Sequence, residues 1–382
     1  MQKLKKLGIG GNIGKWLGNF LLERRQKVSV NKHLSNPSDI ISGVPQGTIL
    51  APILFLIYIS DIGDSLSHSV ITSYADDSKT SKLIRSLTDG QQLQCDLNKL
   101  FNWTEENLMS FNVDKFEVLR IGKNENLKNE IKYTTPDGIN LPEKSTVKDL
   151  GVLFNNKGDF SDHISVKAAK ARGVAGLILR TFITREPAPL MMLFKALAIP
   201  IMEYGSIIWS PHKRGEINEI ESVQRAFTSK LEGMKELNYH QRLRELKIYS
   251  LERRRERYDL LYAYKILQRS VPNIGLQFKW SARCGRTLVP PPVKKNSSEH
   301  AKTLRHNTYR ARVSRVFNSL PAEIRNIPAD TPLVRIKSML DRYFATIRDE
   351  PLLPGYNTAA VSNSIQHQRR TEESPSRMIH RR

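Results

Sequence analysis

The sequence contains few residues of the kinds that cross-link chains or bind zinc. Only two cysteines, Cys95 and Cys284, occur among 382 residues, and they stand far apart without the spacing of a metal-binding pair. This excludes a disulfide framework, and therefore a disulfide partner, and also a zinc site. Nine histidines are scattered along the chain, and His163, near a predicted helix start, is expected to be a capping or surface residue. The scarcity of cysteine indicates a reducing, intracellular compartment.

Acidic residues and long apolar runs are also scarce. The chain has 38 acidic against 60 basic residues, which gives a formal net charge of +22. No uninterrupted apolar run reaches the length of about 18 residues that a membrane helix needs, so no membrane partner is expected. The excess of positive charge points to a polyanionic partner, and nucleic acid is the default choice.

The most informative stretch runs from Ser73 to Lys79 and contains two adjacent carboxylates, Asp76 and Asp77. The apolar residues before it predict a strand, and Asp and Ser favour turns, so the pair is expected at the tip of a hairpin. Adjacent carboxylates repel each other, and oxygen ligands suit Mg²⁺ or Mn²⁺. Taken alone, the pattern fits both a metal site and an ordinary solvated turn.

Upstream, a loop from Ser42 to Thr48 precedes the nearly all-apolar stretch Ile49 to Ile59. Glycines in the loop allow the backbone to approach a ligand closely, and Gln46 offers an amide. The apolar stretch predicts a helix of about three turns, and a helix N-terminus favours anionic phosphate. A plain loop that enters a buried core helix explains the same residues.

The two motifs, taken together, resemble those of a known protein family. The stretch Ser42-Gly43-Val44-Pro45-Gln46-Gly47-Thr48, followed by Tyr74-Ala75-Asp76-Asp77, resembles the reverse transcriptase domain of non-long-terminal-repeat (LINE) retrotransposons, closest to jockey-like elements. The resemblance implies an α+β fold, in which a partial polymerase palm with a small antiparallel sheet precedes an all-helical thumb and a C-terminal extension. It implies RNA-directed DNA synthesis, with an RNA template, a DNA primer or target and deoxynucleotides as partners. The implied setting is the nucleus or a cytoplasmic ribonucleoprotein.

The resemblance also assigns roles to residues. In the implied two-metal nucleotidyl transfer, Asp76, assisted by Asp77, holds Mg²⁺ or Mn²⁺. Lys115 matches a lysine of a later motif that serves the departure of pyrophosphate. Leu150 and Gly151, in a predicted hairpin, match the primer grip, where backbone geometry positions the primer end. The implied nucleotide and template contacts are Pro45, Gln46, Gly47, Tyr74 and Ala75.

One ligand of the family pattern is missing. The first motif of the family carries an aspartate at a strand end, expected shortly before Leu4, but the chain starts at Met1. The acids before residue 42 are Glu23 and Asp39, and neither ends an apolar strand. Losing even an outer partner of a metal ligand costs about 10- to 100-fold, so losing a bridging ligand should cost at least as much. We therefore expect a polymerase-family chain with impaired activity.

Two alternatives come from other classes. One is a non-catalytic RNA- or DNA-binding remnant of a mobile element that keeps the basic thumb. The other is a decaying product whose palm lacks an interior strand and folds poorly, because exposed strand edges aggregate. An RNA-dependent RNA polymerase or a group II intron maturase shares the Asp-Asp chemistry. The amino-acid sequence of the 42–48 loop and the long C-terminal region make both of these enzymes less favoured.

Periodicity predicts the remaining elements. We expect a helix after Gly11, a half-buried strand through Val28 and Val30, a helix over 93–108 and a hairpin over 148–158. Further helices are expected from Ser161, over 191–201, over 217–231 and over 333–347. The predicted organisation is a partial palm at 1–160, a helical thumb at 161–280, a linker at 281–300, a C-terminal helical element at 301–356 and a disordered basic tail at 357–382.

Basic residues gather in two predicted helical stretches. The helix from Ser161 carries Lys167, Lys170, Arg172 and Arg180 outside its apolar face, which suits contact with a duplex. A second group, interleaved with tyrosines, suits phosphate contact and stacking, although its glutamates could equally pair with it locally. Its basic members are Arg242, Arg244, Lys247, Arg253, Arg254, Arg255 and Arg257.

Overall fold

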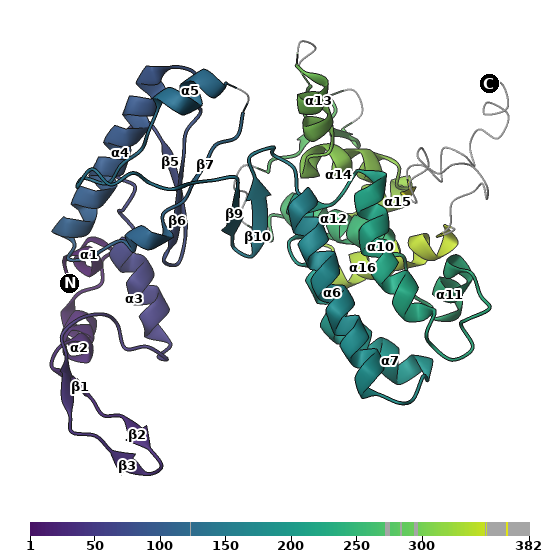
Figure 1. Ribbon diagram of the computed structural model, residues 1–382, viewed down its shortest axis with the longest axis horizontal. Coiled ribbons are helices and arrows are strands. Elements are labelled where there is room, and N and C mark those ends of the chain that lie inside the picture. The colour runs from purple at the N-terminus through teal and green to yellow at the C-terminus, as the bar shows by residue number, and fades with distance from the viewer. Residues whose placement is uncertain are drawn as a thin grey trace. The chain divides into compact units, whose positions relative to one another are not determined.

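The computed structural model describes residues 1–122, 124–271, 276–282, 285–293, 297–347, 349 and 364–365. The chain divides into two compact units, Met1–Lys144 and Ser145–Arg382, and each is described by itself (Figure 1). Helices and short paired strands are mixed along the chain, which is an α+β architecture. Among the described residues no helix is both long and apolar enough to cross a membrane.

The first unit combines helices with short strands. Its longest helix, α4, begins with a capping box, in which the Ser86 hydroxyl accepts from the Asp89 N–H and the Asp89 carboxylate accepts from the Ser86 N–H. In chain order its elements are α1 (Gln2–Lys6), α2 (Gly11–Leu21), β1 (Arg24–Gln26), β2 (Ser29–Val30), β3 (His33–Leu34), β4 (Ser38–Ile40), α3 (Leu50–Ile59), β5 (Val70–Tyr74), β6 (Asp77–Ser81), α4 (Leu87–Glu106), η1 (Val113–Lys115), β7 (Val118–Leu119), α5 (Glu125–Glu130) and β8 (Glu143–Lys144).

The predicted palm sheet is not present as one sheet. The described strands of the whole chain form six separate two-stranded pairs, and one of them, β7 with β8, is parallel. Strands of two to five residues offer too few ladder bonds to build a wider sheet. A strand, β2, includes Val30, but the half-burial expected at Val28 and Val30 is wrong, because both side chains are exposed.

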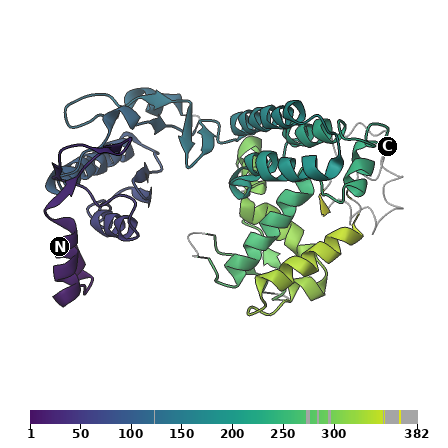
Figure 2. The same ribbon diagram turned by 90° about the horizontal axis from the view of Figure 1, so that it is seen from below.

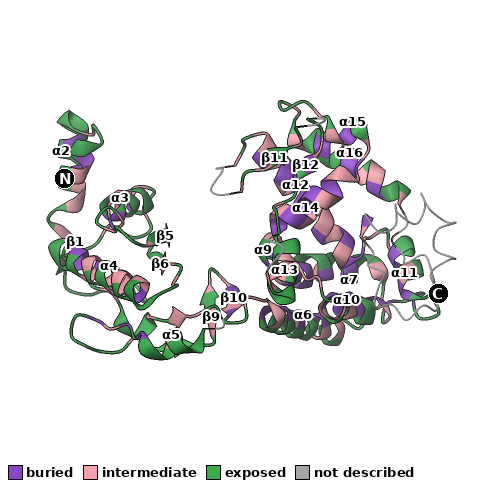
Figure 3. Ribbon diagram, turned by 90° about the horizontal axis from the view of Figure 1, so that it is seen from above, coloured by how far each residue is buried: buried purple, intermediate pink, exposed green. Residues whose placement is uncertain are grey.

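The core of the first unit lies between α3, α4 and β5. Ile59 from the end of α3 packs with Leu100 and Trp103 of α4, and Ile71 of β5 joins them. Burying such side chains contributes about 1.5–3 kcal/mol each. The hairpin β5–β6 is therefore anchored through its first strand, while most of its residues remain exposed (Figure 3).

A half-buried ion pair ties the N-terminal helix to this core. Lys3 Nζ lies 2.7 Å from the Asp61 carboxylate, which also accepts a hydrogen bond from Trp103 Nε1 at 3.0 Å. Burial would raise the pKa of Asp61, but the hydrogen bonds from Lys3 and Trp103 outweigh it and hold the pKa below its usual value. One carboxylate thus joins α1, the end of α3 and α4.

A second carboxylate holds the loop that enters β5. Asp96, fully buried on α4, accepts the backbone N–H groups of Ser67 at 3.2 Å, of His68 at 2.8 Å and of Ser69 at 2.8 Å. It also accepts the Ser69 hydroxyl at 2.8 Å and lies 3.4 Å from Lys99 Nζ. Since β5 begins at the next residue, this cradle sets where the strand starts.

The hydrogen bonds to Asp96 also fix its charge state. Burial alone would raise the pKa of its carboxyl, yet the bonds from the backbone and from Ser69 favour the charged form and lower the pKa to about 2. The carboxylate therefore stays ionised over the whole physiological range.

The second unit is mainly helical. In chain order its described elements are β9 (Thr146–Asp149), β10 (Val152–Asn155), α6 (Ser161–Thr181), α7 (Pro187–Leu193), the π-helical turn η2 (Phe194–Ala198), α8 (Ile199–Glu203), α9 (Ser206–Trp209), α10 (Arg214–Thr228), α11 (Tyr239–Glu245), α12 (Leu251–Leu267), β11 (Lys279–Trp280), β12 (Leu288–Val289), α13 (Glu299–His306), α14 (Tyr309–Asn318), α15 (Ala322–Arg325) and α16 (Leu333–Thr346).

Small residues let the helices of this unit approach closely. Ala168, Ala171 and Ala175 recur on one buried face of α6, against which α10 and the η2–α8 segment pack (Figures 1 and 2). The periodicity from Ser161 is thereby confirmed. A second core, between α12, α14 and α16, contains Phe317 and Phe344 with Leu260.

Three expectations for this unit need comment. His163 is fully buried rather than a surface residue, and its Nδ1 accepts the N–H of Leu153 at 3.1 Å. The predicted linker is partly structured, because Leu288 of β12 is buried in the second core and pairs with β11. The predicted tail at 357–382 lies outside the described residues, apart from 364–365.

We predict that Asp96→Asn destabilises the first unit by about 2–3 kcal/mol, because an amide nitrogen would replace an acceptor facing backbone N–H groups. The pKa of the native carboxyl is lowered from 3.8 to about 2, so its stabilisation is complete above about pH 5 and is lost as the pH falls through about 2. Hydrogen exchange of the Ser67–Ser69 amides between pH 7 and pH 3 measures both effects. Asp114→Asn, at an exposed carboxylate of the same unit, is the control. Equal protection in both variants would contradict the assignment.

Candidate functional site

The hairpin β5–β6 carries the two adjacent carboxylates at its tip, as predicted. The strands are antiparallel and Tyr74 pairs with Asp77, which leaves Ala75 and Asp76 as a two-residue loop. Both carboxylates are exposed, and Tyr74 is 69% exposed. Across the strands, the hydroxyls of Ser73 and Ser78 lie 2.9 Å apart.

Ala75 occupies an unfavourable backbone conformation. Its φ of 52° lies in the left-handed region, which costs an L-residue about 1–2 kcal/mol relative to the right-handed one. Two-residue hairpin loops require such a conformation because it matches the twist of the strands. Strain of this kind persists where the surrounding structure supports it, and it is common at functional sites.

The loop before α3 is held by its own polar groups. Thr48 Oγ1 donates to the Pro45 carbonyl at 2.9 Å and accepts the N–H of Ala51 at 3.3 Å. Gly47 has a φ of 81°, which only glycine adopts without strain. Gln46 is exposed, so its amide is available to a ligand.

Lys115 ends the short helix η1 and is exposed. Within the first unit, therefore, the predicted site residues lie on three elements: the loop before α3, the hairpin tip and η1. No side-chain hydrogen bond or ion pair joins these three groups in the described part of the unit. Each group is positioned by its own local contacts.

Leu150 and Gly151, the predicted primer-grip residues, form the two-residue loop of the β9–β10 hairpin in the second unit. Both have positive φ, 45° for Leu150 and 84° for Gly151. A hairpin is present, but it covers Thr146–Asn155 and not the predicted 148–158. Its turn has the left-handed pair of residues typical of a type I′ loop. Leu150 is 47% exposed.

Carboxylate oxygens at the β5–β6 tip are suitable ligands for a divalent cation. Mg²⁺ is commonly held by one or two carboxylates, with water and substrate phosphates completing its shell. Asp76 and Asp77 fit that donor set for a single ion. Among the described residues there is no group of three or more acidic, histidine or cysteine side chains that could hold a metal. Cys95 is exposed and free, and Cys284 lies outside the described residues.

Most of the second basic group has a structural role. Arg242 is buried and donates to the backbone carbonyls of Leu237 and Arg225, and Arg253 and Arg255 are also buried. These side chains are not placed for phosphate contact. The mixture of arginine and glutamate that left two interpretations open therefore favours internal pairing.

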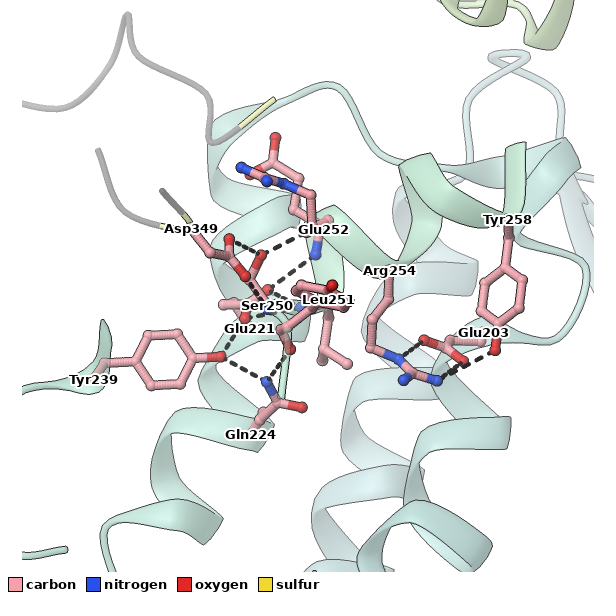
Figure 4. Close-up of polar contacts among 12 residues, drawn as sticks. Glu203, Glu221, Gln224, Tyr239, Ser250, Leu251, Glu252, Arg254, Tyr258 and Asp349 are labelled. Atoms are coloured by element: carbon pink, nitrogen blue, oxygen red, sulfur yellow. Dashed lines mark hydrogen bonds and ion pairs between the residues drawn. The ribbon is translucent and has the colours of Figure 1, made fainter. Parts of the chain in front are cut away.

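The pairing is visible around the start of α12 (Figure 4). Arg254 binds Glu203 with two nitrogens, at 2.5 and 3.0 Å. Nearby, the buried Glu221 accepts the N–H of Leu251 at 3.1 Å and the hydroxyl of Tyr239. Burial raises the pKa of Glu221 despite the hydrogen bond from Tyr239.

Three lysines on β9 and α6 remain available to a partner. Lys148 and Lys170 are exposed and Lys167 is half-buried, and none of them forms an ion pair within the described parts of the chain. Burial, together with the positive charges of Lys170 and Lys148, lowers the pKa of Lys167. We call these three residues the lysine cluster. Like charges that lie close together suit a polyanion.

Two residues that support these sites were missed by sequence reasoning. Asp96 stands on the apolar face of α4, between Leu93 and Leu100 at helical spacing, and an acid on a buried face is a signal of a buried network. Tyr204, whose hydroxyl donates to the Leu150 carbonyl at 2.9 Å, gave no signal because it lies 54 residues away along the chain.

Residues 1–154 match the family described as reverse transcriptase (RNA-dependent DNA polymerase). This match spans the loop and the hairpin described above, and it supports a reverse transcriptase domain in this part of the chain.

The chain is also similar to individual proteins of Drosophila melanogaster. The chain is 25% identical over 231 residues to the RNA-directed DNA polymerase from mobile element jockey, covering 56% of this chain and 24% of the relative. It is 25% identical over 288 residues to the probable RNA-directed DNA polymerase from transposon BS, covering 70% and 30%. It is 23% identical over 223 residues to the corresponding probable enzyme from transposon X-element, covering 54% and 24%. These relatives come from mobile elements, and the similarity supports a LINE-like reverse transcriptase domain.

The aligned region spans about a quarter of the length of these relatives.

We predict that the left-handed conformation of Ala75 makes the hairpin tolerate glycine there and resist a β-branched residue. Ala75→Val should destabilise the β5–β6 hairpin by about 1 kcal/mol relative to Ala75→Gly. Hydrogen exchange of the hairpin amides measures the difference in opening free energy.

Thr72, an exposed position of β5 with ordinary strand pairing, provides the matched control. There the order should reverse, because valine favours and glycine weakens a strand. The same order at both positions would count against a left-handed residue 75.

Proposed function

We propose that the chain carries out RNA-directed DNA synthesis, or part of it, with the β5–β6 tip as its catalytic centre. The single observation that carries the proposal is the pair Asp76 and Asp77, which are exposed at the tip of the β5–β6 hairpin, beside the strained Ala75, in a stretch that matches the reverse transcriptase family. In this reaction the 3′-hydroxyl of a primer attacks the α-phosphate of a deoxynucleotide, and pyrophosphate leaves.

The carboxylates would hold Mg²⁺ or Mn²⁺, which in such enzymes stabilises charge on the reacting oxygens. Pro45, Gln46 and Gly47, together with Tyr74 and Ala75, would shape the nucleotide and template pocket. Their exposure supports this role, because Gln46 and Tyr74 present polar groups to solvent from ordered segments.

Lys115 would assist the departure of pyrophosphate, because its exposed ammonium can offset the developing negative charge. Leu150 and Gly151 would position the primer end through their backbone. The partial palm, thumb and C-terminal extension are parts of the same proposal, as is action in the nucleus or in a cytoplasmic ribonucleoprotein.

A second candidate function is non-catalytic RNA or DNA binding. It is favoured by the lysine cluster, because Lys148, Lys167 and Lys170 can attract a polyanion without any contribution from the carboxylates.

We predict that primer extension by this chain on an RNA template, where it occurs, requires Mg²⁺ or Mn²⁺ and falls at least about 100-fold in Asp76→Asn. Asp114→Asn, at another exposed acid of the first unit, should retain activity. Extension that survives Asp76→Asn would refute the assigned centre. Salt-sensitive binding without extension in the unsubstituted chain would support the second candidate.

We predict that the lysine cluster contacts phosphates. Lys167→Gln and Lys170→Gln should each weaken binding to an RNA–DNA duplex and reduce the slope of log affinity against log salt by about 1. Lys302→Gln removes the same charge, but Lys302 is already paired with Glu299 at 2.7 Å, so its slope should not change. Three equal slopes would mean that net charge, and not this cluster, governs binding.

A further inference from the structure

The turn between β9 and β10 rests on a tyrosine from a distant part of the second unit. The Tyr204 hydroxyl donates to the carbonyl oxygen of Leu150 at 2.9 Å. A Cβ built on Gly151 would lie 3.2 Å from Cε1 of the Tyr204 ring, so the ring closely approaches the backbone of the turn. Tyr204 therefore contacts both residues of the two-residue loop.

The turn needs such support because of its conformation. Leu150 has a φ of 45°, in the region that L-residues with large side chains rarely adopt. An unfavourable conformation persists only where neighbouring contacts hold it. The hydrogen bond from Tyr204 ends on the carbonyl of this strained residue and so opposes its return to ordinary strand geometry.

Tyr204 is itself fixed by a closed chain of contacts. It lies between α8 and α9, where its carbonyl accepts the indole N–H of Trp209 at 2.7 Å. Trp209 is 1% exposed, and its ring centroid is 5.1 Å from that of the buried His163. His163 Nδ1 accepts the N–H of Leu153 at 3.1 Å, which returns the chain of contacts to β10.

The outer side of this arrangement faces solvent. Tyr204 is 57% exposed and Leu150 is 47% exposed, so the turn is accessible to solvent although the hydrogen bond from Tyr204 fixes its conformation. Lys148 of the lysine cluster stands two residues before Leu150 and adds positive charge beside the turn. A rigid, accessible turn next to cationic side chains suits contact with the end of a nucleic-acid strand.

We propose that Tyr204 is a positioning residue for the primer, and that its hydroxyl holds the Leu150–Gly151 turn in the conformation that contacts the primer 3′ end. The inference rests on the proposed function, because it takes the turn to be the primer grip. It adds a residue 54 positions away, whose role is exerted through the turn and not by contact with the reacting atoms.

The test compares two ligands with the full chain. One is a DNA primer on an RNA template with a recessed primer 3′ end, and the other is a blunt RNA–DNA duplex of equal length. We expect the unsubstituted chain to prefer the recessed end. Tyr204→Phe, which removes only the hydroxyl, should lower that preference about three- to tenfold, as expected for one hydrogen bond, and leave affinity for the blunt duplex unchanged. Hydrogen exchange of the amides at 150–152 should speed up by a similar factor.

A second pair of variants covers the case in which Tyr204→Phe folds poorly. Gly151→Ala forces a Cβ against the Tyr204 ring, whereas Gly233→Ala introduces the same residue at a φ of 72° with nothing within 4 Å. Both substitutions place alanine in a left-handed backbone conformation, so the two variants are matched in backbone strain. Only Gly151→Ala should lower the preference for the recessed end.

The outcomes separate the two levels of the proposal. If the unsubstituted chain shows no preference for the recessed end, the primer-grip part of the proposed function fails and the role of Tyr204 fails with it. If that preference exists and persists in folded Tyr204→Phe or Gly151→Ala, the role of Tyr204 alone is overturned. A lowered preference with unchanged affinity for the blunt duplex supports both, because general loss of stability would weaken the two ligands alike.

Discussion

Buried carboxylates that accept backbone N–H groups are the interaction on which both units depend. In the first unit Asp96 gathers three successive N–H groups and thereby sets the start of β5. In the second, Glu221 accepts the N–H groups of Leu251 and Glu252 at the start of α12, where the helix dipole also favours negative charge. The strands have only two to five residues, so no wide sheet among the described residues fixes where these elements begin. A buried carboxylate that accepts several N–H groups does so instead.

The use of positive charge differs between arginine and lysine. Arginines bind acids within the fold with two nitrogens, as Arg254 binds Glu203 and Arg312 binds Asp259. The planar guanidinium suits such paired, partly buried contacts, whereas a lysine ammonium is strongly hydrated and prefers the surface. The lysine cluster on β9 and α6 follows that preference. Part of the excess of basic residues is therefore paired within the fold.

The two turns assigned to the reaction share one physical feature. Ala75 and Leu150 both have left-handed backbone conformations, at φ values of 52° and 45°, in two-residue hairpin loops. Each loop is exposed at its tip, and its strands or its supporting side chains are anchored in a packed core. Such an arrangement keeps the backbone precise at the point where a substrate would bind, while the stability comes from residues elsewhere.

The sequence by itself determined the local features of this protein. Periodicity located α2, α4, α6, α10 and α16, turn residues located the tip of the β5–β6 hairpin, and two short motifs indicated a reverse transcriptase. These predictions succeed because a motif, a turn or a helical face is encoded within a few neighbouring residues.

The tertiary structure alone decided which charges are buried: the arginines of α12 could have formed a solvated face, and His163 could have been a surface residue. It also decided that the strands remain in pairs and that Tyr204 supports Leu150. Burial and long-range hydrogen bonds depend on which distant segments pack together, and spacing along the chain does not contain that information.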